Sequence, residues 1–179
     1  MFGETGYIIG QALSWVAVVF GFISFQMKTE KGILFFQILT AFAFAAHYFM
    51  IGNAMTAVAL NLLSTVKCTC YYIRKKIGST NLFLPIFFTA LLVVTSILTW
   101  DGWYSIFILS GLFVNSLSFA LASAPVMRKL NLIKSPLCLT YNVFVWSTGG
   151  IIFEIAVIIS TAIGVYRDWK GTKGQNAQA

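Results

Sequence analysis

The stretch over residues 32–76 decides the fold of this chain, and it reads GILFFQILTAFAFAAHYFMIGNAMTAVALNLLSTVKCTCYYIRKK. It contains two apolar runs, 32–51 and 54–73. Each is about 20 residues long, the length that a helix needs to cross about 30 Å of hydrocarbon. The turn between them, Gly52-Asn53, is too short for a loop, so the two helices are expected to be antiparallel neighbours. The stretch therefore predicts a transmembrane hairpin.

Few polar side chains interrupt this hairpin. Polar groups at membrane depth are costly and usually face protein or a cavity, so they are the first candidates for function. They are Gln37, Thr40 and His47 on the first helix and Asn61, Ser64 and Lys67 on the second. Lys67 has two interpretations, either an anchor that snorkels to the membrane surface or the partner of a buried acid.

The composition is that of a membrane protein. Hydrophobic residues make up 59% of the 179 residues and charged residues only 9%, whereas a soluble domain has roughly 25% charged residues. The net charge of +7 does not indicate nucleic-acid binding, because the basic residues stand at the ends of apolar runs instead of forming one basic face. A cleaved signal peptide is not expected, since Glu4 precedes an apolar run that is too long for one.

Seven apolar runs predict a single all-α integral membrane domain over residues 1–179. Lys134 and Pro136 interrupt the sixth run, but a lysine can snorkel to the near interface and a membrane helix tolerates proline as a kink. The tail over 170–179 is small and polar and is expected to be disordered. The seven runs are 6–27, 32–51, 54–73, 82–99, 103–124, 127–146 and 150–166.

The basic residues predict an orientation. All of the 12 lysines and arginines except Lys67 lie in or beside four segments, and seven crossings place these segments on one side of the membrane. By the positive-inside rule that side is cytoplasmic. The N-terminus is then expected outside and the C-terminus in the cytoplasm.

An internal repeat divides the chain. The stripe of small residues from Gly10 to Gly21 recurs with the same spacing from Gly111 to Ala122, and similar stripes relate the other helices of the two halves. A single stripe usually means only close helix packing, but three in register favour a repeat. The predicted fold is therefore two parallel three-helix repeats, 6–76 and 103–167, joined by an inverting fourth helix over 82–99. Transporters of this architecture bind solute near the midplane, between the repeats.

Several short motifs resemble the YgjV-like family of bacterial inner membrane proteins, and the resemblance covers nearly the whole chain. HYFMIG at 47–52 is followed by NLLS at 61–64, and YN at 141–142 by STGG at 147–150, Glu154 and Arg167. That family is similar in plan to the SWEET and PQ-loop transporters, which move sugars or amino acids by alternating access. The resemblance implies three helices, an inverting helix and three helices, in the bacterial inner membrane.

The chain departs from those relatives in two places. Where PQ-loop proteins carry Pro-Gln near the end of the first helix of each repeat, it has Phe25-Gln26 and then Ala124-Pro125. SWEET proteins use an asparagine on the third helix of each repeat. Asn61 matches one of these, but the other position holds Glu154. An acid there argues against a neutral-sugar mechanism.

Two titratable residues are candidates for proton coupling. Glu154 is the only carboxylate inside a predicted span, about one turn below the outer end of the last helix. An ionised carboxylate at that depth needs a partner or becomes protonated, unless it is a wetted acid at the interface. His47 is the only histidine and can titrate near neutral pH, although a lone histidine in a helix is more often structural.

The sequence thus predicts a seven-helix carrier of a small polar solute, sugar-like or another small metabolite, with proton coupling as an option. The alternative is a non-transporting scaffold or sensor. The expected partners are the lipid bilayer and the solute, with a homo-oligomer left open and nucleic acid not expected. The candidate substrate-binding residues are His47, Asn61, Asn115, Tyr141, Asn142 and Glu154.

An enzyme is not expected from this sequence. It has no Ser-His-Asp set, glycine-rich phosphate loop or cluster of metal ligands. The cysteines, Cys68, Cys70 and Cys138, lie in apolar helices and are interpreted as packing residues. Neither a metal nor another cofactor is therefore predicted.

Overall fold

The computed structural model describes residues 3–27, 29–52, 54–77, 83–121 and 124–176, and within them the chain forms seven α-helices and no strand. Each predicted apolar run falls on one helix, so the all-helical prediction is confirmed. The helices are α1 (Gly3–Gln26), α2 (Glu30–Ile51), α3 (Met55–Lys76), α4 (Phe83–Leu98), α5 (Ser105–Leu121), α6 (Ala124–Phe144) and α7 (Thr148–Asn176).

The helices differ in how well they suit a bilayer. Two stretches among the described residues, Glu4–Ser24 and Lys31–Ile51, are long and apolar enough to cross it by length and composition. Phe83–Leu98, Ser105–Ser118 and Thr148–Ile163 are apolar but shorter. α6 continues as a helix through Pro136.

The hairpin of α2 and α3 has well-defined ends. Thr29 precedes α2 and its side-chain hydroxyl accepts a hydrogen bond from the backbone N–H of Gly32 at 3.1 Å, as an N-cap does. Gly52 ends α2 with φ of 79°, a left-handed conformation that suits glycine because it has no Cβ. Asn53, the other residue of the predicted turn, lies outside the described residues.

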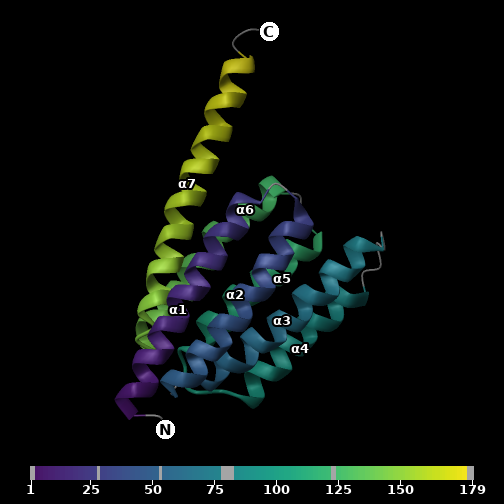
Figure 1. Cartoon of the computed structure of the whole chain (residues 1–179). Coiled ribbons are helices and arrows are strands. Elements are labelled where there is room, and N and C mark those ends of the chain that lie inside the picture. Colours follow the sequence, from purple (N-terminus) through teal and green to yellow (C-terminus); the bar gives the residue numbers. More distant parts are fainter. Residues whose placement is uncertain (1–2, 28, 53, 78–82, 122–123, 177–179) are drawn as a thin grey trace.

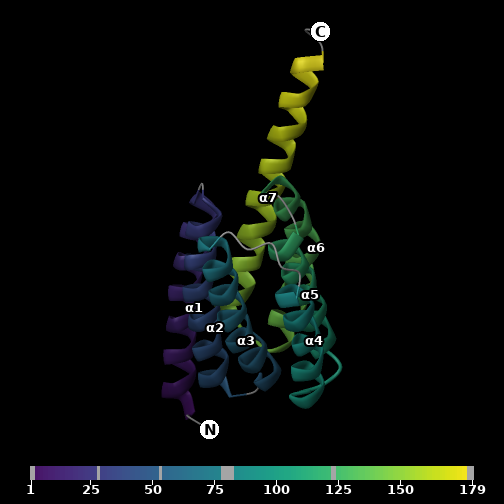
Figure 2. The same ribbon diagram turned by 90° about the vertical axis from the view of Figure 1, so that its right-hand side faces the viewer.

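The end of α7 differs from the prediction. The sequence predicted a disordered tail from residue 170, whereas the structure continues α7 as a helix to Asn176. Adding residues to an existing helix is easier than starting one, and this segment contains no proline. The final turns of α7 project beyond the other helices (Figures 1 and 2).

The helices form one bundle in which chain neighbours pack together. α2 packs against α1 and α3, and α6 packs against α5 and α7. α4 lies against both α3 and α5. The first helix, α1, also contacts the last helix, α7. Viewed from the side, α1, α2 and α3 stand opposite α4, α5 and α6 (Figure 2).

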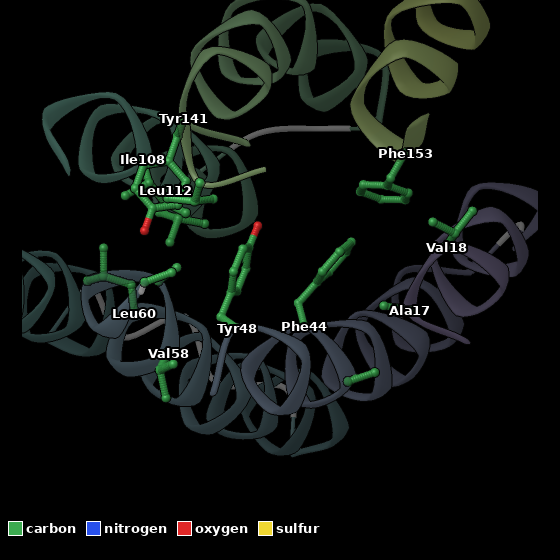
Figure 3. Packing of buried hydrophobic residues seen from close by; sticks show 14 of the residues in the cluster. Ala17, Val18, Phe44, Tyr48, Val58, Leu60, Ile108, Leu112, Tyr141 and Phe153 are labelled. Carbon is green, nitrogen blue, oxygen red and sulfur yellow. The ribbon is translucent and has the colours of Figure 1, made fainter. Parts of the chain in front are cut away.

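The main core fills the space between these two groups. Phe44 and Tyr48 project from α2 toward Phe153 and Tyr141 on the opposite side (Figure 3). Phe44 and Phe153 have ring centroids 5.5 Å apart, and Tyr48 and Tyr141 have centroids 6.2 Å apart in an edge-to-face arrangement. Aromatic pairs at these separations pack favourably. The aromatic side chains therefore join helices that are far apart in sequence.

The outer surface of the bundle is strongly apolar. Many large hydrophobic side chains are exposed, including Ile8 at 67% and Leu98 at 79%. A soluble monomer rarely exposes large contiguous apolar patches. Lipid is the solvent that such a surface suits.

Replacement of Gly149 by leucine is expected to lower the stability of the bundle by about 1–3 kcal/mol. A Cβ at Gly149 on α7 would overlap the side chain of Ser14 on α1 and approach its backbone carbonyl carbon to 3.0 Å. Thermal unfolding in detergent would measure the loss. Ala162→Leu, at an exposed position of the same helix, is the control and should leave the midpoint nearly unchanged. Equal midpoints for both variants would contradict close α1–α7 packing.

Candidate functional site

A cavity lies inside the bundle. Its volume is about 60 Å³, room for a handful of water molecules. Helices α2, α3, α5, α6 and α7 contribute to its wall, so helices of both groups line it. The polar residues of the wall are Gln37, Thr40, Tyr48, Asn61, Ser64, Asn115, Lys134, Asn142 and Glu154.

An ion pair between Lys134 and Glu154 forms part of this wall. Nζ of Lys134 on α6 is 3.1 Å from Oε1 of Glu154 on α7, and their side chains are only 13% and 6% exposed. The ammonium also lies 5.7 Å from the centre of the Phe153 ring, within cation–π range. Two charges removed from water are stable there only because they neutralise each other.

Glu154 therefore has the partner that the sequence required, and it is not a wetted acid at the interface. Lys134 does not snorkel to the membrane surface as predicted, because the acid on the next helix attracts its ammonium into the interior. Only one carboxylate oxygen takes part in the pair. The other, Oε2, is buried and has no hydrogen-bond partner among the described residues, so it can accept a proton or a donor.

A hydrogen bond between Tyr48 and Asn142 spans the cavity. The Tyr48 hydroxyl on α2 donates to Oδ1 of Asn142 on α6, and both residues are buried. Asn61, also in the wall, uses its amide nitrogen within its own helix, where Nδ2 donates to the backbone oxygen of Ala57 at 2.8 Å. Any movement that separates α2 from α6 must break the Tyr48–Asn142 bond.

His47 lies outside the cavity wall. It is fully buried, with Nδ1 2.7 Å from the backbone oxygen of Gly10 on α1 and Nε2 2.7 Å from the Ser147 hydroxyl just before α7. The Ser147 hydroxyl in turn accepts the backbone N–H of Gly150 at 3.2 Å. His47 therefore ties three segments of the bundle together.

Lys67 is on α3, the helix that contributes Asn61, Ser64 and Cys68 to the cavity wall, but it is not itself part of that wall. It is fully buried in the middle of α3, and its ammonium has no hydrogen-bond partner within the described part of the chain. Both sequence interpretations, a snorkelling anchor and an ion-pair partner, are therefore wrong in this structure. The neighbouring Ser64, one turn earlier on α3, lines the cavity and also has a hydroxyl without a partner.

The structure brings some of the predicted site residues together and leaves others apart. Asn61, Asn115, Asn142 and Glu154 line the cavity, whereas His47 and Tyr141 are buried in the surrounding core. Sequence reasoning missed the roles of two wall residues, Tyr48 and Lys134. A signal for Lys134 existed, because it and Glu154 are opposite charges within predicted spans.

Comparison with known proteins points to one family. Residues 8–172 match the family model Imp-YgjV, described as a bacterial inner membrane protein. No curated protein and no solved structure matches the chain. The match runs from within α1 to within α7, and the family description agrees with the apolar surface of the bundle. The chain belongs to the Imp-YgjV family of bacterial inner membrane proteins.

Proposed function

We propose that this protein is a carrier that moves a small polar solute across the bacterial inner membrane by alternating access. The observation that supports this best is the cavity lined by helices of both groups, with polar side chains and a buried ion pair in its wall. Buried charges cost free energy in a membrane interior, and they often mark solute or ion pathways.

The proposed architecture is two parallel three-helix repeats related through α4. In support of this, α1–α3 pack in chain order, α5–α7 do the same, and α4 contacts one helix of each set. With seven crossings the N-terminus lies outside and the C-terminus in the cytoplasm, where the basic segments are retained. In the transport cycle the two units rock about the cavity and open it to each side in turn.

The Tyr48–Asn142 hydrogen bond and the aromatic contacts of Figure 3 hold the two units in the observed state. The cavity in this state has room for only a few water molecules. A solute of several heavy atoms then enters only when the units separate.

Filling the cavity is expected to stop transport without unfolding the protein. Asn115 lines the cavity and is partly buried, so Asn115→Leu places an apolar side chain where a solute must bind. Solute counterflow in proteoliposomes, screened over small polar metabolites, should fall at least about tenfold, since one lost hydrogen bond and one steric conflict exceed about 1.4 kcal/mol. Phe113→Leu, at an exposed position on the same helix, is the control. Equal flux in both variants would refute a role for the cavity.

Proton coupling is tested at Glu154. Lys134 on α6 is the ion-pair partner of its carboxylate, and two other titratable groups, Cys138 on α6 and Tyr48 on α2, line the same cavity. If the carboxylate carries the coupled proton, Glu154→Gln removes the pH dependence of flux per folded molecule. Flux that keeps its pH dependence in this variant would place the coupling elsewhere.

The alternative, a scaffold or sensor that transports nothing, predicts a different result. Its polar interior would serve only to hold helices together, so no solute in the screen would exchange. Asn115→Leu would then change stability alone. Solute counterflow that the Asn115 variant abolishes and the Phe113 variant retains excludes this alternative.

A further inference from the structure

The interior of the bundle carries more positive than negative charge. Among the described side chains between the helix ends, the buried charged groups are Lys67, Lys134 and Glu154. Glu154 neutralises Lys134, which leaves the ammonium of Lys67 uncompensated. An isolated ammonium in a nonpolar interior costs several kcal/mol, so it needs an anion or must lose its proton.

Lys67 is not part of the cavity wall, but Ser64, one turn earlier on α3, belongs to it. Ser64 and Lys67 are three residues apart on α3 and therefore neighbours on one helix face, and the buried polar atoms of both lack partners. Lys134, which is part of the cavity wall, is already paired with Glu154. The wall adds the amide side chains of Asn61 and Asn115.

We propose that the solute is a small organic anion with a single carboxylate, held by Lys67 with Ser64 donating to it. This proposal rests on the carrier function above and names the class of its solute. One negative charge matches the one uncompensated positive charge. The amide side chains of the cavity wall suit a hydroxyl group beside the carboxylate.

The test compares an anion with its neutral counterpart. The full chain in detergent is heated with sodium lactate, with propane-1,2-diol, which has similar size but no charge, or with sodium chloride at equal ionic strength. Because a ligand that binds the folded state stabilises it, lactate is expected to raise the unfolding midpoint and the other two are not. Equal protection by the diol or by chloride would overturn the proposal.

The matched variants are Lys67→Met and Lys31→Met. Lys67→Met should weaken lactate binding about tenfold to a hundredfold, the loss expected for a hydrogen bond to a charged group. Lys31 is exposed at the start of α2, so its replacement should change nothing. Removing an unpaired buried charge does not destabilise the fold, so both variants are expected to be folded. If Lys67→Met binds lactate as the parent does, Lys67 is only a buried neutral amine and the proposal is wrong.

Counterflow in proteoliposomes separates this proposal from the carrier function. If a neutral polyol exchanges but lactate and glycolate neither bind nor exchange, the carrier function stands and the anion proposal fails. If lactate protects the protein through Lys67 but no anion crosses, the anion site stands and the carrier function fails.

Discussion

Replacing Glu154 by leucine is expected to lower the free energy of unfolding by about 3–5 kcal/mol. Its carboxylate is the ion-pair partner of Lys134, at 3.1 Å, and both side chains are buried. The substitution leaves the ammonium in the interior with only the face of the Phe153 ring for compensation. Reversible unfolding in mixed micelles, followed by the fluorescence of the five tryptophans, would measure the change.

The double variant Glu154→Leu with Lys134→Met distinguishes the ion pair from simple packing. It removes both charges and is expected to recover most of the lost stability, since a hydrophobic pair of similar volume replaces an ion pair at little cost. Glu4→Gln, at an exposed acid of α1, is the control and should stay within about 0.5 kcal/mol of the parent. A double variant no more stable than Glu154→Leu would contradict a stabilising pair.

His47→Ala is expected to destabilise the protein by about 2–4 kcal/mol. The substitution removes two buried hydrogen bonds, to Gly10 and Ser147, each contributing about 1 kcal/mol. It also leaves a cavity beside Tyr48, whose ring centroid is 4.8 Å from that of the imidazole. The same unfolding assay gives the value, with the exposed Phe42→Ala on α2 as the control.

A double-mutant cycle with Ser147→Ala tests the structural role of His47. The two residues should couple by about 0.5–1.5 kcal/mol, because they share one hydrogen bond. If His47→Ala instead kept full stability and lost the pH dependence of flux, the histidine would belong to the transport machinery. The structure favours coupling between His47 and Ser147, because both ring nitrogens of His47 already have protein partners.

Much of the fold follows from local sequence. The apolar runs locate all seven helices, because the length and hydrophobicity of a run determine whether it can form a buried or lipid-facing helix. The Gly52 turn is equally local, since only a residue without Cβ readily takes the left-handed conformation. The structure differs from the predicted tail over residues 170–176, where α7 continues, because a weakly helical composition does not by itself stop a helix that is already formed.

The site was predictable only in part. Asn61, Asn115, Asn142 and Glu154 could be selected because polar groups in apolar runs are rare and costly. Which of these residues lie close together could not be predicted, because that depends on how each helix is rotated against helices that are distant in sequence. His47 was selected for the same reason, because it is a polar residue in an apolar run. The packing of α2 against α1, however, places it beside the backbone oxygen of Gly10, outside the cavity wall.

The sequence by itself determined that this chain is an all-helical membrane protein and that Glu154 needs a partner, because hydrophobicity and the cost of a buried charge belong to each segment alone. Only the tertiary structure decided that Lys134 is that partner and that the ammonium of Lys67 has no hydrogen-bond partner among the residues that the structure describes. Pairing is a property of two helices together. It depends on their relative rotation and axial shift, which the packing of the whole bundle sets.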